Sequence, residues 1–150
     1  MPTLSARRLL PIAVAYLPVP LAGAVLSARW GVGASPEGGP RDMFLRGTAL
    51  TPPLFLPATL LAAAAAARSG GRPGRAGATV AALVGAAFLA GSTANLPNDL
   101  AAARAAGSPT RLTAGLGAAH LALSLALLAH ALPRAVRGGS TGVSAASPAS

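Results

Sequence analysis

The residues best suited to chemistry in this chain are one histidine and a group of polar residues that precedes it. His120 lies within an apolar stretch, and Ser124 follows one helical turn later on the same face. A neutral imidazole can accept or donate a proton near physiological pH, so His120 could act as an acid or a base. The preceding group consists of Ser92, Thr93, Asn95, Asn98 and Asp99. Together these residues predict a small polar pocket.

Four apolar stretches must position these side chains, and each has about the length that a helix needs to cross a bilayer. They cover residues 9–26, 47–67, 76–96 and 112–132. Every acidic residue and every arginine lies outside them or at their edges, because a charge at the centre of a membrane helix costs about 2.5 to 3.5 kcal/mol. The sequence therefore predicts an all-α fold, a four-transmembrane-helix bundle over residues 1–137, with a disordered tail over 138–150.

The distribution of arginines predicts how this multi-pass bundle is oriented. Of the twelve arginines, seven lie in the N-terminus, the second loop and the tail, and five lie in the first and third loops. Because arginine-rich loops stay in the cytoplasm, both termini are expected there. The expected location is the cell membrane, and the lack of Lys beside abundant Ala, Arg, Gly and Pro is typical of a GC-rich bacterial genome. An alternative is a signal peptide, since Arg7 and Arg8 precede an apolar run that ends near the small residues 22–24.

Helix geometry gives His120 a definite depth. It lies eight residues into the fourth stretch, which is ~12 Å below the start of that stretch at about 1.5 Å per residue, near the level of residues 88–92. The polar pocket is thus expected in the outer half of the bundle. His130 is close to the inner boundary, where it can reach the lipid headgroups.

Prolines and small residues predict how the helices bend and pack. The prolines expected to kink the first and second helices are Pro18, Pro20, Pro52, Pro53 and Pro57. The small residues that recur four apart are Gly77, Ala81 and Gly85 in the third stretch and Ala118, Ala122 and Ala126 in the fourth. Such spacing lets helix backbones approach closely, so it predicts tight packing of the third and fourth helices.

The polar residues also have purely structural explanations. His120 and Ser124 could make a hydrogen bond between helices, worth about 0.6 to 2 kcal/mol. Asn98 or Asp99 could cap a short helix over residues 100–106 that ends at Gly107. These explanations stay open beside the pocket.

Composition excludes several classes of function. The chain has no Cys, which removes disulfides, thiolate catalysis and Cys-ligated metals. The net charge of +9 is spread over five short segments, so no compact basic surface for nucleic acid is expected. Nucleotide fingerprints and the HExxH motif are absent from the sequence. His120 and His130 lie ten residues apart at different depths, so neither a metal site nor another cofactor is predicted.

One segment resembles a known family. The sequence Asn95-Leu96-Pro97-Asn98-Asp99-Leu100, followed by Arg111 at the start of the last helix, is similar to the small four-helix anthrone oxygenase-like membrane proteins. This resemblance implies that Asn95, Asn98, Asp99 and Arg111 line a site, with His120 added by this chain. The aromatic residues and the Asn that precede the Arg in that family are replaced here by Ser108-Pro109-Thr110.

Three functions follow from these patterns. The first is a small integral membrane protein that acts through lipid contacts, a membrane-protein partner or a second copy of itself. The second is an enzyme without a cofactor that acts on an apolar substrate in the outer pocket. The third is an accessory subunit of a transporter. The enzyme interpretation requires His120 and the segment 95–99 to meet around an open cavity, whereas the interaction interpretation expects a filled interior and an exposed small-residue stripe. The sequence alone favours interaction over catalysis.

Overall fold

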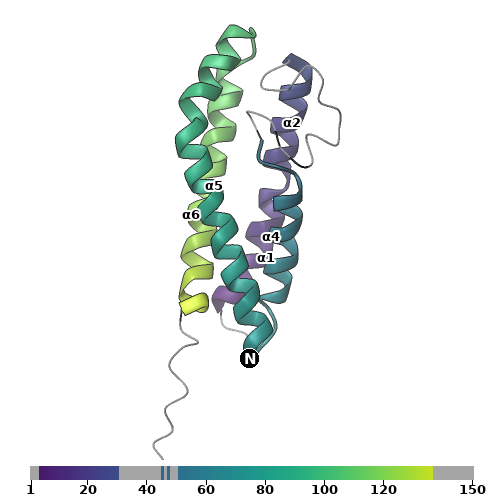
Figure 1. Cartoon of the computed structure of the whole chain (residues 1–150), viewed down its shortest axis with the longest axis vertical. Coiled ribbons are helices and arrows are strands. Elements are labelled where there is room, and N and C mark those ends of the chain that lie inside the picture. Colours follow the sequence, from purple (N-terminus) through teal and green to yellow (C-terminus); the bar gives the residue numbers. More distant parts are fainter. Residues whose placement is uncertain (1–3, 31–44, 46, 48–50, 137–150) are drawn as a thin grey trace, which may run out of the picture.

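A computed structural model of the chain describes residues 4–30, 45, 47 and 51–136, with side chains from residue 8 onward. The expected disordered tail over 138–150 and the glycine- and proline-rich part of the first loop lie outside the described residues. The described helices are α1 (Leu4–Tyr16), α2 (Pro18–Trp30), α4 (Phe55–Ala66), α5 (Gly71–Ala105) and α6 (Thr110–Val136) (Figure 1). The fold is therefore all-helical, as the sequence predicts.

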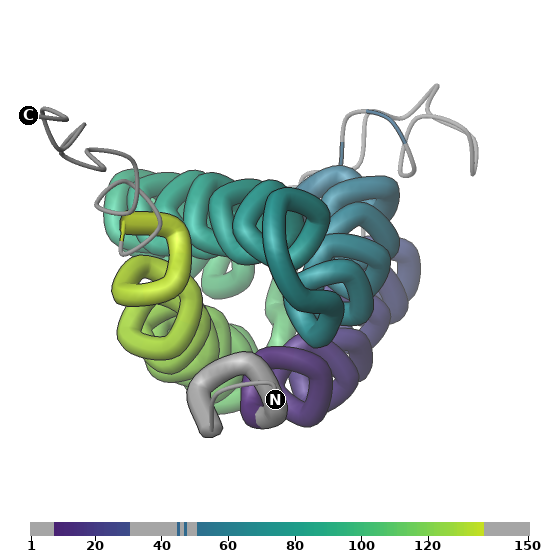
Figure 2. Tube along the Cα trace, turned by 90° about the horizontal axis from the view of Figure 1, so that it is seen from below, coloured from purple at the N-terminus to yellow at the C-terminus, as the bar shows by residue number. Residues whose placement is uncertain are grey.

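The helices form a four-cornered bundle. Going around it, α1 packs against α4, α4 against α5, α5 against α6, and α6 against α1, with the most extensive contact between α5 and α6 (Figure 2). The start of α1 and the end of α6 lie at one end of the bundle, and the turn between α5 and α6 lies at the other (Figure 1). We call these the terminal end and the turn end.

A proline divides the first apolar stretch into two helices. Pro18 has no backbone N–H, so it cannot donate the hydrogen bond that a continuous helix would make to the Val14 carbonyl oxygen. The N–H of Leu17 donates to that oxygen instead, at 3.1 Å, in a tighter turn. α1 and α2 nevertheless follow one another closely enough that residues Arg8–Trp30 have the length and hydropathy of a single membrane crossing.

The second apolar stretch is helical only in its inner part. α4 begins at Phe55, so the prediction of a helix across residues 47–67 is wrong at its outer end. Pro52 and Pro53 explain the difference, because each removes a donor and each disfavours the helical conformation of the residue before it. The Thr51 hydroxyl ties this irregular segment to α2 by donating to the Pro20 carbonyl oxygen at 2.9 Å.

The third apolar stretch continues further than predicted. α5 passes through Pro97 without interruption, so a separate capped helix after Asn98 or Asp99 is wrong. α5 ends where Gly107 adopts a φ of +68°, a left-handed conformation that favours glycine. The N–H groups of Gly107 and Ser108 then donate to the carbonyl oxygens of Arg104 and Ala103, which completes the C-terminal cap of the helix.

Close packing in the half of the bundle nearer the terminal end depends on glycines of α5. A Cβ atom at Gly77 would come within 2.6 Å of the Ala63 carbonyl oxygen of α4, and one at Gly85 would come within 3.2 Å of the Leu127 Cβ atom of α6. The small-residue stripe of α5 therefore serves two neighbours, and not α6 alone as predicted. Ala118 and Ala122, in the matching stripe of α6, are exposed.

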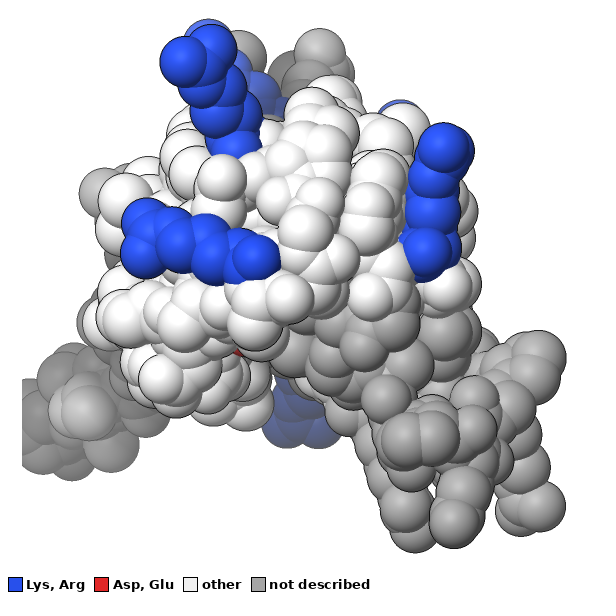
Figure 3. Space-filling view, turned by 90° about the horizontal axis from the view of Figure 1, so that it is seen from above, with Lys and Arg blue, Asp and Glu red and all other residues white. Residues whose placement is uncertain are grey.

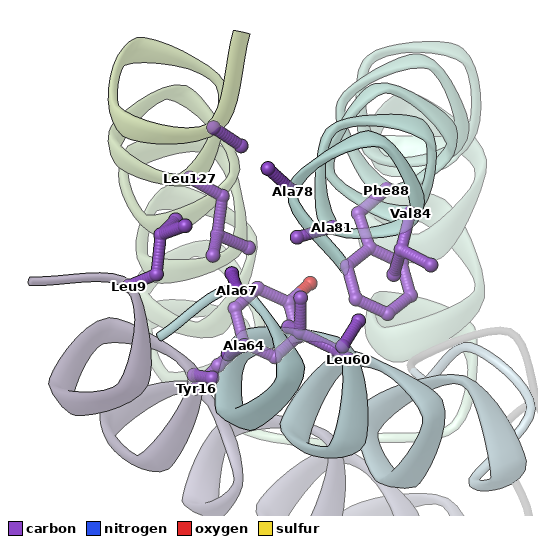
Figure 4. Close-up of a cluster of buried hydrophobic side chains, with 13 residues drawn as sticks. Leu9, Tyr16, Leu60, Ala64, Ala67, Ala78, Ala81, Val84, Phe88 and Leu127 are labelled. Atoms are coloured by element: carbon purple, nitrogen blue, oxygen red, sulfur yellow. The ribbon is translucent and has the colours of Figure 1, made fainter. Parts of the chain in front are cut away.

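The core joins all four corners of the bundle. Alanines and a few large side chains fill it, with Tyr16 of α1, Leu60 of α4 and Phe88 of α5 in one cluster (Figure 4). In the described residues, three helical stretches are long and apolar enough to cross a membrane, and the apolar helix Phe55–Ala66 is shorter. This composition and length are compatible with a membrane protein.

Candidate functional site

A cavity of about 290 Å³ lies between the helices toward the turn end of the bundle. Its walls come from the segment before α4, from the middle and end of α5, and from the first half of α6. The lining residues that matter for chemistry are Thr51, Phe88, Ser92, Asn95, Asp99, Thr113 and His120. The rest of the wall is largely apolar.

The late start of α4 explains why a cavity occurs here. At the level where a full second helix would fill the bundle, the chain is the irregular segment Thr51–Leu54, and its residues Thr51, Pro52 and Pro53 line the cavity. Irregular backbone at membrane depth is tolerated where it faces a cavity or is buried in protein. The two prolines also lack N–H groups, which leaves fewer donors to satisfy.

His120 lines this cavity on the side nearer the terminal end, and aromatic side chains contact its ring. Its Nδ1 atom is hydrogen-bonded to the Tyr16 hydroxyl, and its ring meets the Tyr16 ring edge-on with the centroids 5.2 Å apart. Phe88 approaches the imidazole in the same edge-on manner at 6.3 Å. The side chain is only 6% exposed, yet in the described part of the chain its Nε2 atom has no hydrogen-bond partner.

The hydroxyl oxygen of Thr113 is a second buried polar atom without a hydrogen-bond partner among the described residues. Thr113 belongs to α6 and is 2% exposed. Buried polar groups are almost always hydrogen-bonded in folded proteins, because leaving one unpaired costs about 1 to 3 kcal/mol. Both atoms belong to residues that line the same cavity.

The structure brings half of the predicted pocket residues to this cavity. Ser92, Asn95, Asp99 and His120 line it. The others lie elsewhere, and each has an identifiable position. Thr93 is exposed and donates to the Leu89 and Ala90 carbonyl oxygens, Asn98 and Arg111 are exposed, and Ser124 is buried below the cavity.

Ser124 supports the site without touching the cavity. Its hydroxyl donates to the backbone carbonyl oxygen of His120 at 2.6 Å, within α6. The expected hydrogen bond between helices exists, but Tyr16 makes it with the His120 side chain. Ser124 thus strengthens the local helix, and Tyr16 holds the imidazole across the bundle.

Asp99 is the described acidic residue nearest the opening of the cavity. It lies beyond the apolar stretch 76–96, and its partial burial raises the pKa of its carboxyl to about 6. Arg29, Arg104 and Arg111 are the described arginines at this end of the bundle, and all are exposed. The space-filling view from the turn end shows basic side chains at the periphery and hardly any acidic surface (Figure 3). Asp99, the one acidic side chain among the described residues, is partly buried and lines the cavity.

Sequence reasoning missed three residues of the site: Tyr16, Thr51 and Thr113. Tyr16 is the single tyrosine of the chain and lies in the middle of an apolar stretch. A buried tyrosine needs a hydrogen-bond partner for its hydroxyl, so the sequence could have predicted a polar group on another helix opposite Tyr16. Thr51 and Thr113 are unremarkable in the sequence, and only the packing of the helices reveals them.

Neither a resident metal nor a known relative explains this arrangement. In the described part of the chain, no three His, Cys, Asp or Glu side chains come together in a way that could hold a metal ion. No protein-family model, curated protein or solved structure matches this chain. The function has to be argued from the cavity itself.

Proposed function

We propose that this protein is a multi-pass protein of the cell membrane that binds a compact, largely apolar molecule in the cavity beside His120. The observation that carries the proposal is a cavity of about 290 Å³ with largely apolar walls, lined by His120 and Thr113, whose buried Nε2 and Oγ1 atoms have no partner among the described residues. Binding sites commonly combine apolar walls with a few placed polar groups. The interaction interpretation expected an exposed small-residue stripe, which Ala118 and Ala122 fit, and a filled interior, which the cavity does not fit. The cavity is the reason to favour ligand binding.

The outer surface of the bundle supports the membrane part of the proposal. Large apolar side chains are exposed on several helices and would form extensive apolar patches in water. They include Val14, Leu21, Val25, Leu83, Leu125 and Leu132. In the proposed topology the terminal end faces the cytoplasm, following the arginine distribution, and the cavity lies in the outer half of the bilayer. α4 and the segment before it would complete the fourth crossing.

The cavity volume restricts the ligand to a small molecule. Packed at the density of about 0.74 that proteins show, 290 Å³ holds on the order of a dozen non-hydrogen atoms, which is one ring or two fused rings. A whole lipid chain is too large for a cavity of this volume. A lipid-soluble compound with one polar group satisfies both the walls and the two unpaired atoms.

Filling the cavity tests this proposal. Gly91 lines the cavity, and a Cβ atom placed there has no heavy atom within 4 Å outside its own surroundings, so Gly91→Leu adds a side chain directly into the open space. Gly115 on α6 has the same free surroundings but is exposed and lies outside the cavity lining, which makes Gly115→Leu a matched control.

The measurement is the chemical shift of leucine methyl groups in lipid nanodiscs during titration with indane, a bicyclic hydrocarbon. We expect saturable shifts at Leu56 and Leu116, which line the cavity, but only gradual partitioning effects at the exposed Leu125 and Leu132. Gly91→Leu should weaken binding at least tenfold, and Gly115→Leu should leave it unchanged. Equal behaviour of all four methyl groups in the wild-type protein would refute a binding cavity.

A second candidate is catalysis on the bound molecule. It is favoured by one observation, namely that His120, Asn95 and Asp99 line the same cavity, as the enzyme interpretation requires. The resemblance to the anthrone oxygenase-like proteins agrees for Asn95 and Asp99, which line the cavity, but not for Asn98 and Arg111, which do not. Chemical conversion of an apolar probe by the wild-type protein, lost in both His120→Ala and Gly91→Leu, would establish catalysis.

A further inference from the structure

We infer that Tyr16 fixes the tautomer of His120 so that Nε2 carries the hydrogen, and that the cavity therefore selects a neutral molecule with a carbonyl-type acceptor oxygen. This inference rests on the proposed binding function and adds the polarity of the ligand. Tyr16 acts here as a positioning residue, because it faces His120 from another helix and does not line the cavity.

The direction of the hydrogen bond between Tyr16 and His120 decides the tautomer. A neutral imidazole has one N–H group and one nitrogen that can only accept. A phenol is the stronger donor of the two groups, and an imidazole nitrogen is the stronger acceptor, so the favoured arrangement has the Tyr16 hydroxyl donating to Nδ1. The single hydrogen of the ring then lies on Nε2.

The hydroxyl of Ser124 also lies beside the Tyr16 hydroxyl and bears on this direction. Its own hydrogen is committed to the His120 backbone carbonyl oxygen at 2.6 Å, so Ser124 can only accept from Tyr16 and competes with Nδ1 for the phenol hydrogen. The imidazole nitrogen is the more basic of the two acceptors and is therefore favoured. The opposite tautomer would need Nδ1 to donate to Tyr16 and would turn a bare acceptor nitrogen toward the cavity. The two arrangements therefore predict opposite polarity for the group that meets the ligand.

With Nε2 carrying the hydrogen, the inner wall of the cavity presents an N–H donor. The complementary ligand group is an acceptor, such as the oxygen of a ketone or quinone. The Thr113 hydroxyl can reinforce this by donating as well, because it is also without a partner among the described residues. The carboxyl of Asp99 on the same cavity disfavours an anionic ligand, since like charges repel in a poorly screened site. The chemistry selects a neutral molecule.

His130 provides an internal reference for the tautomer. Its Nδ1 atom lies 2.9 Å from the Ala126 carbonyl oxygen, and a carbonyl oxygen can only accept, so Nδ1 of His130 carries a hydrogen. The chain has only these two histidines. In nitrogen-15 NMR spectra of histidine-labelled protein, the neutral side chains should therefore show opposite tautomers, with His120→Ala giving the assignment.

Three probes of nearly the same shape test the ligand polarity. They are 1-indanone, which has only an acceptor; indole, which has only an N–H donor; and indane, which has neither. We expect 1-indanone to bind the wild-type protein about threefold to tenfold more tightly than indole or indane, which is the effect of one net hydrogen bond. In Tyr16→Phe the ring loses its fixed tautomer, and the preference for 1-indanone should fall below about twofold.

The outcomes separate this inference from the proposed function. A wild-type His120 with its hydrogen on Nδ1, or tighter binding of indole than of 1-indanone, overturns the inference while the binding cavity stands. If no probe causes saturable shifts at Leu56 and Leu116, the proposed function fails and the ligand selection fails with it. The tautomer of the wild-type protein is measurable without any variant, so an unfolded Tyr16→Phe protein would not prevent a decision.

Discussion

The ring of Tyr16 lies parallel to the ring of Phe88, with the centroids 4.7 Å apart and the planes 7° from each other. This stack joins α1 to α5 across the bundle, where neither helix shares an extensive contact with the other elsewhere. It forms the boundary between two halves of the protein. Toward the terminal end the interior is closely packed, and toward the turn end it opens into the cavity.

Loss of the Tyr16 hydroxyl should destabilise the protein without removing the ring stack. Tyr16→Phe leaves His120 Nδ1 without its partner, so we expect a loss of about 1 to 3 kcal/mol in the free energy of unfolding. Unfolding in mixed micelles measures it. Thr59→Val is the control, since it removes an exposed hydroxyl that bonds within its own helix, and its effect should stay within about 0.5 kcal/mol. Equal effects of the two variants would contradict the structural role of Tyr16.

The contact of α4 with α5 should depend on the absence of a side chain at Gly77. In Gly77→Ala the new methyl group would approach backbone atoms of Ala63 and Ala67 at 2.6 Å, so the helices must separate, at a cost of about 1 to 3 kcal/mol. Gly91→Ala on the same helix meets no such atoms and should be neutral or stabilising by up to about 1 kcal/mol. Thermal unfolding of both variants in one detergent makes the comparison.

The turn between α5 and α6 should be sensitive at one position. Gly107 has a φ of +68°, which L side chains adopt at a cost of about 1 to 2 kcal/mol, so Gly107→Ala should lose that amount of stability. Gly115→Ala lies eight residues later in a regular helix with free surroundings and should not lose stability. If Gly107→Ala were as stable as Gly115→Ala, the left-handed cap would be wrong.

Sequence patterns predicted the positions of the helices better than their ends. Hydropathy located every described helix, because lipid-compatible stretches are long and free of charge. The two errors both concern prolines. Pro52 and Pro53 stopped a helix that hydropathy extended, while Pro97 did not stop α5, which continues to Ala105.

The sequence predicted the depth of the site along the bundle and some of the residues that line it. The register of His120 against residues 88–92 is confirmed by its edge-on contact with Phe88. The partner of His120 could not be predicted, because the relative rotation of α1 and α6 depends on packing that no short-range pattern contains. The cavity itself lies where the second helix lacks its outer turns, and apart from the two prolines no residue pattern indicates how long the irregular segment is.

The carboxyl of Asp99 should make stability depend on pH. Burial raises its pKa from 3.8 to about 6, so the folded state binds this proton more tightly than the unfolded state does. The contribution of the Asp99 carboxyl to the free energy of unfolding should therefore fall as the pH rises from about 4 to about 6, and the loss should be complete above that range. His120 lines the same cavity and is retained in Asp99→Asn, so any contribution of its own is common to both proteins.

Asp99→Asn should thus remove this contribution, so the stability profiles of the two proteins should differ in slope between these two pH values. The midpoint of thermal unfolding, measured at several pH values for both proteins, compares them directly. The wild-type and variant midpoints should diverge as the pH rises, with the variant the more stable above pH 6. Parallel profiles would mean that the Asp99 carboxyl is as well solvated in the folded protein as in the unfolded chain.

The central claim is that His120 meets a bound molecule in the cavity, and the most direct measurement is the nitrogen-15 NMR signal of its imidazole with and without 1-indanone. The account predicts a saturable change at His120 Nε2 in the wild-type protein, no change at His130, and no change at either histidine in Gly91→Leu. A His120 signal that is insensitive to the probe in the wild-type protein, or that responds equally in Gly91→Leu, would contradict it.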